Sequence, residues 1–188
     1  MFWLIVGILL WSLVHLFPSL MPERRAALLA ERGNLYQGGF ALLIVLSLVL
    51  IVIGWRSTPP EAWYVPPSWG RHLNMLLTLI AIILLGASHA PTRIRQYLRH
   101  PMLSGVAVWA FGHLLANGET RSVLLFGGML IWSLVSIYTI NRRDGHWKKP
   151  AQTTSWAAEI KLLLISLLVY VVLIFLHPYF AGMPVVAH

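Results

Sequence analysis

Two histidines lie deep inside long apolar segments of this chain, each four residues after a tryptophan. The pairs are Trp11 with His15 and Trp109 with His113. Residues four apart share one face of an α-helix, so each imidazole is expected beside a flat indole ring. Ionisable groups are costly in hydrocarbon, so such histidines are candidates for a functional site in which they bind a metal ion or a haem iron. The alternative is a structural role, in which each imidazole hydrogen-bonds a neighbouring helix.

Other polar residues lie at the two ends of the apolar segment that contains His113. Arg99 and His100 stand directly before Pro101, and a helix start with proline in its first turn attracts an anion such as a carboxylate, a phosphate or a lipid headgroup. His100 is about 220° around an ideal helix from His113, so the two are not expected to bind one ion. Asn117 follows His113 by one turn and either orients its imidazole or begins a tight turn.

The composition is that of a membrane protein. Of 188 residues, 58% are hydrophobic and 11% are charged, against roughly 25% charged residues in soluble domains. The chain has no cysteine, which excludes disulfides, thiolate metal sites and haem attached through a Cys-x-x-Cys-His motif. Its six acidic residues lie in loops or at the ends of apolar segments. Hydrolysis by paired carboxylates and transport through buried acids therefore lose support.

The apolar segments predict an all-α, polytopic membrane protein with six transmembrane helices in a single domain covering residues 1–188. An apolar helix of about 20 residues crosses roughly 30 Å of hydrocarbon. The helices are expected at residues 2–20, 36–55, 72–90, 102–118, 121–140 and 160–178. No positive charge precedes the first of them, so we expect it to stay uncleaved. A short interfacial helix is expected from Pro22 to Arg32, and the proline-rich loop over residues 57–70 is not expected to be helical.

The positions of the basic residues predict the orientation. The first, third and fifth loops hold 11 of the 14 Lys and Arg residues, which are Arg24, Arg25, Arg32, Arg93, Arg95, Arg99, Arg142, Arg143, Lys148, Lys149 and Lys161. Basic loops stay in the cytoplasm, so we expect these loops inside and both termini outside. The chain has a formal net charge of +8, and its basic residues lie in short loops between apolar segments. This placement favours contact with membrane lipids and does not favour binding to nucleic acid.

The residues that carry a family resemblance lie mainly between positions 99 and 118. They are Arg99-His100-Pro101-Met102-Leu103-Ser104-Gly105, followed by Trp109, His113, Asn117 and Gly118. This motif resembles the signature of the NnrU family of bacterial membrane proteins, and the Trp11–His15 pair and the Arg142-Arg143-Asp144 loop are also similar. The resemblance covers the first five helices. It implies a multi-pass protein of the bacterial inner membrane with a role in denitrification and nitric oxide metabolism.

The resemblance also implies a cofactor. The NnrU family includes the 15-cis-zeta-carotene isomerase of plants and cyanobacteria, a haem b membrane protein with histidine ligands. Carried over by motif position, its ligands fall on His15 and His113. Trp11, Trp109, His100 and Asn117 would then belong to the haem site, and Arg99 would be placed for a haem propionate. A haem-dependent, isomerase-type activity is one function that this resemblance implies.

Two other functions are compatible with the sequence. Arg-His-Pro-x-x-x-Gly at a helix start is similar to membrane methyltransferases of the isoprenylcysteine methyltransferase type, where it helps to bind S-adenosylmethionine. Those enzymes usually carry a tyrosine inside the motif and a later pair of glutamates, whereas this chain has Met102-Leu103-Ser104 and only Glu159. The other possibility is a non-enzymatic assembly factor for a respiratory reductase.

Overall fold

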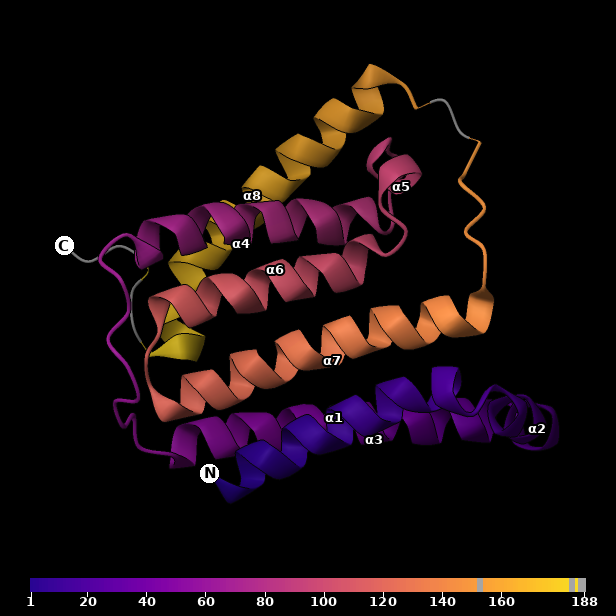
Figure 1. The fold of residues 1–188 in the computed structure, drawn as a ribbon, viewed down its shortest axis with the longest axis horizontal. Coiled ribbons are helices and arrows are strands. Elements are labelled where there is room, and N and C mark those ends of the chain that lie inside the picture. Colours follow the sequence, from indigo (N-terminus) through magenta and orange to yellow (C-terminus); the bar gives the residue numbers. More distant parts are fainter. Residues whose placement is uncertain (152–153, 183–184, 186–188) are drawn as a thin grey trace.

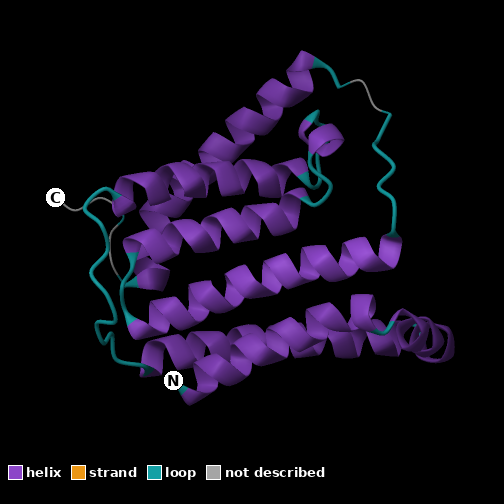
Figure 2. Cartoon of the chain, in the orientation of Figure 1, coloured by secondary structure: helices purple, strands orange, loops and turns teal. Residues whose placement is uncertain are grey.

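The structure is a computed structural model that describes residues 1–151, 154–182 and 185. These residues form helices joined by loops, with no strand beyond one isolated β-bridge. The helices are α1 (Phe2–Leu20), α2 (Pro22–Arg32), α3 (Asn34–Ser57), α4 (Gly70–Ala87), α5 (Ile94–Tyr97), α6 (Pro101–Ala116), α7 (Thr120–Asp144) and α8 (Trp156–Ala181). The expected all-helical class is confirmed, and the loops gather at the two ends of the helices (Figure 2).

Five of these helices are long and apolar enough to cross a membrane, namely α1, α3, α4, α7 and α8. The sixth expected span, α6, is apolar but has 16 residues, so it extends over about 24 Å of the roughly 30 Å of hydrocarbon. The fold is therefore that of a multi-pass helical membrane protein, with five helices long enough to span the membrane and one shorter apolar helix beside them.

Several helix ends differ from the sequence prediction for local reasons. The helix expected to reach residue 118 ends at Ala116, because Asn117 has extended backbone angles (φ −132°, ψ 109°). The helix expected to reach residue 90 ends at Ala87, where a turn begins. The helix expected to end at residue 140 continues to Asp144 and stops at Gly145, whose positive φ of 63° suits glycine. The interfacial helix at Pro22–Arg32 is confirmed as α2, whereas α5 was not predicted.

The long helices pack in the spatial order α3, α1, α7, α6, α4, α8 (Figure 1). As a result α7 lies between α1 and α6, and α8 folds back on α4. Small residues allow the closest approaches, as is usual between membrane helices. A Cβ atom at Gly7 would lie 2.7 Å from the Ile51 nitrogen, and one at Gly54 would overlap the Leu4 backbone, so glycines set the α1–α3 distance.

The loops at one end of the bundle pack against each other without forming a helix. The backbone N–H groups of Trp63 and Tyr64 donate to the Gly118 carbonyl at 2.7 and 3.1 Å, and the Thr120 N–H donates to the Glu61 carbonyl at 2.8 Å. The loop between α3 and α4 thus covers the tight turn between α6 and α7. Burial raises the pKa of the Tyr64 phenol, which donates to the Asn117 carbonyl.

The most basic loops meet at the opposite end, which we call the basic end. It contains α2, α5 and the loop that follows α7, whereas α1 begins and α8 ends at the other end (Figure 1). The fold therefore brings together the basic residues that the sequence distributes over three separate loops.

Candidate functional site

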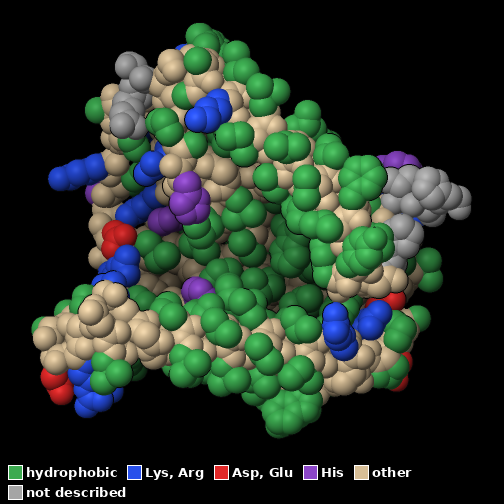
Figure 3. All heavy atoms as spheres, turned by 180° about the vertical axis from the view of Figure 1, so that it is seen from behind, with side chains coloured by type: hydrophobic (Ala, Val, Ile, Leu, Met, Phe, Trp, Pro, Cys, Tyr) green, Lys and Arg blue, Asp and Glu red, His purple; other side chains and the backbone are tan. Residues whose placement is uncertain are grey.

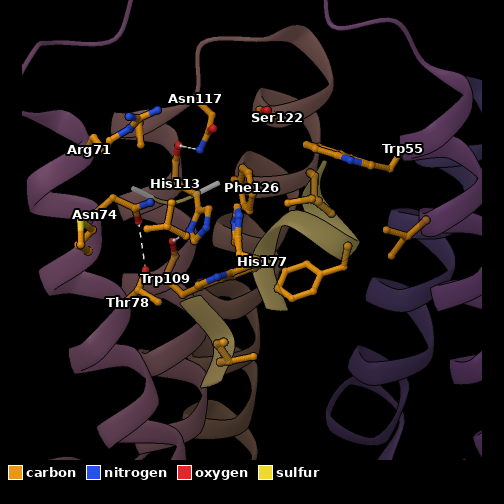
Figure 4. Close-up of a pocket in the computed structure, with 18 of the residues that line it drawn as sticks. Trp55, Arg71, Asn74, Thr78, Trp109, His113, Asn117, Ser122, Phe126 and His177 are labelled. Atoms are coloured by element: carbon orange, nitrogen blue, oxygen red, sulfur yellow. Dashed lines mark hydrogen bonds between the residues drawn. The ribbon is translucent and has the colours of Figure 1, made fainter. Parts of the chain in front are cut away.

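A cavity of about 550 Å³ lies between α3, α4, α6, α7 and α8, away from the basic end. Its volume is within the roughly 300–1,000 Å³ typical of small-molecule sites. Aromatic and polar side chains line it, among them Trp55, Asn74, Trp109, His113, Phe126 and His177 (Figure 4). From behind, the bundle is visibly hollowed between its two walls, and hydrophobic side chains line the hollow (Figure 3).

His113 is held in one orientation on the cavity wall. Its Nδ1 donates to the Trp109 carbonyl at 2.8 Å, since a carbonyl can only accept. The imidazole stacks on Phe126 with a centroid distance of 4.4 Å and lies 5.0 Å from the Trp109 ring. A proton fixed on Nδ1 leaves the lone pair on Nε2, which is the form in which histidine ligates a metal.

His177 of α8 lines the same cavity, and Figure 4 places it close to His113. His177 is not among the site residues that the sequence predicts, and it lies near the end of the last expected helix. The structure shows that α8 packs against α4, which places His177, together with Leu173 and Phe180 of the same helix, against cavity residues that lie far away in the chain. His177 also lacks the tryptophan that stands four residues before His15 and before His113, so the pattern that marks those two histidines does not mark it.

His15 lies in a separate aromatic cluster, which does not form part of the described lining of the cavity. Its imidazole packs on Trp11 at 4.1 Å and on Trp132 at 5.3 Å, and its Nδ1 donates to the Trp11 carbonyl at 2.9 Å. The indole nitrogens of Trp11 and Trp132 and the Ser136 hydroxyl are buried without a hydrogen-bond partner among the described residues. Buried polar atoms that lack a hydrogen-bond partner are rare in proteins, so the presence of three in this cluster is unusual.

Helix α7 contacts both histidine clusters. Phe126 stacks on His113 and Trp132 packs on His15, six residues and about 9 Å further along the helix axis. The sequence suggested that the first and fourth membrane helices line one site together. In the fold, α7 lies between these helices, so each imidazole has its own aromatic surroundings.

Two glycines of α6 near His113, Gly105 and Gly112, allow α4 to approach closely. A Cβ atom at Gly105 would lie 2.9 Å from the Ala81 carbonyl oxygen, and one at Gly112 would lie 2.6 Å from Asn74 Oδ1. Asn74 itself accepts a hydrogen bond from Thr78 at 3.3 Å. Close packing of α4 on α6 therefore sets the shape of the cavity beside His113.

The remaining motif residues lie at both ends of α6. At its start, His100 Nε2 donates to Asn141 Oδ1 at 2.9 Å and Arg99 donates to the Gly145 carbonyl at 2.8 Å. These bonds join the beginning of α6 to the end of α7, far from the cavity. At the other end, the Asn117 amide donates to the His113 carbonyl at 2.9 Å, so Asn117 bonds to the helix end and not to the imidazole.

Glu159, the acid that the methyltransferase comparison singled out, makes structural contacts. Its two carboxylate oxygens accept from the Thr92 hydroxyl at 2.8 Å and from the Arg93 N–H at 2.7 Å. The Arg93 guanidinium also lies over the Trp156 ring, 4.1 Å from its centre. Together these contacts attach the beginning of α8 to the loop before α5.

Comparison with known families agrees with the motif between Arg99 and Gly118. The family model described as NnrU protein matches residues 3–185. The chain belongs to the NnrU family. No curated protein and no solved structure matches this NnrU protein significantly. The match extends over α1 to α8, so it includes both histidine clusters and the cavity.

Proposed function

We propose that this NnrU protein binds haem b in the cavity, where His113 and His177 would hold the iron. The observation that carries the proposal is the presence of two imidazoles from different helices in one aromatic-walled cavity. The family resemblance implies His15 as the partner of His113, and the experiment below separates the two assignments.

The residues of the cavity fit such a cofactor. The Nδ1–H bond to the Trp109 carbonyl leaves Nε2 of His113 for iron. Trp55, Trp109 and Phe126 supply flat apolar walls, while Arg56 and Arg71 are also lining residues, and an arginine side chain can pair with carboxylates such as propionates. No group of three or more His, Asp or Glu side chains that could hold a metal occurs in the described residues. Ligation by one or two imidazoles is characteristic of haem.

The protein's own contribution would be to orient the ligand and to keep the site dry. The Trp109 carbonyl holds the proton on Nδ1, and the stacked Phe126 ring restricts rotation of the His113 imidazole. Apolar walls lower the local dielectric, which tunes the potential of a bound redox centre. Haem would supply ligand exchange and one-electron chemistry.

The proposed setting is the bacterial inner membrane, with six membrane-crossing helices and the basic end in the cytoplasm. The positive-inside rule supports this orientation, because the loops with most Lys and Arg residues share one end. Both termini and the His113 cavity would then be on the outer side. A role in denitrification or nitric oxide metabolism, or in haem-dependent isomerase-type redox chemistry, follows from the family resemblance and forms part of the proposal.

The test is the absorption spectrum and pyridine haemochrome of the purified protein after haem-supplemented expression. A Soret band is expected, and H113A and H177A should each abolish or shift it. H15A should leave it unchanged, as should H72A, a variant of an exposed histidine at the start of α4.

Two results would contradict the proposal in different ways. Absence of a Soret band after haem supplementation would refute haem binding. A spectrum altered by H15A and H113A but not by H177A would refute the assignment of His177 and support the pair expected from the sequence.

A further inference from the structure

A second pocket, of about 480 Å³, lies at the basic end, where α1 ends, α2 passes, α3 begins and α7 ends. Its lining combines cationic, polar and apolar side chains: Pro18, Arg25, Tyr36, Gln37, Phe40 and Arg143. We propose that it binds the phosphate group of an anionic phospholipid. This inference concerns a different place from the cavity beside His113 and does not depend on haem binding.

Arg143 is held at the pocket by contacts that leave part of its guanidinium for another acceptor. Its Nε and Nη2 donate to Asp144, and its Nη1 donates to the Pro18 carbonyl at 3.2 Å. Three of the five N–H groups of a guanidinium are thereby used. Asp144 balances part of this charge, but Arg25 of α2 brings a second cation to the pocket. The pocket therefore combines a fixed donor group with net positive charge.

The Tyr36 hydroxyl is an independent indication of a ligand. Its oxygen is buried and has no hydrogen-bond partner among the described residues. A buried hydroxyl almost always has a partner, and its absence costs about 1–3 kcal/mol. Tyr36 lines the pocket beside Gln37. Its oxygen is closed to solvent in this structure, so the proposal requires the Tyr36 side chain to turn and donate its phenolic hydrogen to an acceptor bound in the pocket.

A lipid is the source of phosphate that best matches the surroundings. Basic pockets between membrane helices at the cytoplasmic side commonly bind anionic headgroups. Pro18 and Phe40 form an apolar wall, with Phe40 next to Tyr36 at a ring distance of 6.4 Å. The exposed apolar side chains of α3, such as Leu42, Leu43 and Leu46, offer a surface for the acyl chains.

Lipid binding can be measured by native mass spectrometry of the detergent-solubilised full chain. The probes are dioleoyl phosphatidylglycerol, zwitterionic dioleoyl phosphatidylcholine and inorganic phosphate. We expect tight binding of phosphatidylglycerol only, weakened about tenfold in R25Q and in Y36F, as loss of a hydrogen bond to a charged group implies. The matched controls R24Q and Y97F change exposed side chains outside the pocket and should bind as the parent does.

Three results would overturn the proposal. Equal binding of phosphatidylglycerol to R25Q and R24Q, or equal binding of the two lipids, would show that the pocket does not select an anionic headgroup. Inorganic phosphate that binds as tightly as phosphatidylglycerol would indicate a site for a soluble anion. Y36F removes a single oxygen atom, so it tests the site even if R25Q fails to fold.

Discussion

Substitution of Gly112 by alanine tests whether close packing of α4 on α6 shapes the cavity beside His113. The new Cβ atom would lie 2.6 Å from Asn74 Oδ1 and 3.1 Å from Leu77 Cβ. The first distance is about 0.8 Å shorter than an ordinary van der Waals contact. Asn74 must therefore rotate and lose its bond from Thr78, or α4 must move away from α6. Overpacking of this kind costs about 1–3 kcal/mol of unfolding free energy.

The assay is thermal unfolding in one detergent, followed by tryptophan fluorescence, with the haem spectrum recorded on the same samples. For a chain of this size, 1 kcal/mol corresponds to about 2–4 °C in Tm. We expect a lower Tm and an altered Soret band for G112A. The control is G127A on α7, where a Cβ atom would meet nothing within 4 Å and alanine favours the helix. Equal Tm values for G112A and G127A would refute the packing argument.

Three further predictions concern the ends of the bundle. G118A should unfold at a lower temperature than the parent, because its Cβ atom would overlap the Tyr64 carbonyl and disrupt the loop contacts there; an unchanged Tm would contradict this. E159A should lower the unfolding free energy by about 1–3 kcal/mol, since it removes the acceptor of the buried Thr92 hydroxyl, and denaturant titration in mild detergent would measure the loss. In this cysteine-free chain, K148C should react with an impermeant maleimide only after the inner membrane is opened, whereas E61C should react in intact spheroplasts. The reverse pattern would place the basic end outside.

The sequence predicts the helical elements well because membrane helices are local structures. Each backbone group in hydrocarbon needs a partner within its own helix, so a long apolar run is sufficient to specify the element. The interfacial helix α2 was predicted on a different ground, because Pro22 and Gly33 bound a short segment whose Ala and Leu residues suit a membrane surface. The helix ends were less accurate, because Asn117 and Gly145 end their helices through backbone angles that hydropathy does not report.

The candidate site was only partly predictable. His113 stands out in the sequence because an imidazole is costly in an apolar helix, and the structure places it on a cavity wall as an oriented side chain. His177 does not stand out, because its relevance depends on α8 folding back on α4. Likewise, the separation of His15 from His113 follows from the position of α7 between α1 and α6, which no spacing within either helix specifies.

The sequence by itself therefore determines membrane helices, the segregation of basic loops and the histidines that are unusual in hydrocarbon. These properties depend on the cost of placing single residues in water or lipid. Only the tertiary structure decides which helices are neighbours, and with them the cavity shared by His113 and His177 and the basic pocket beside Tyr36. The outer surfaces of these helices are all apolar, so hydrophobicity gives a helix little preference for one neighbour over another. Small residues and close van der Waals packing between α4 and α6 and between α1 and α3 decide which helices are neighbours.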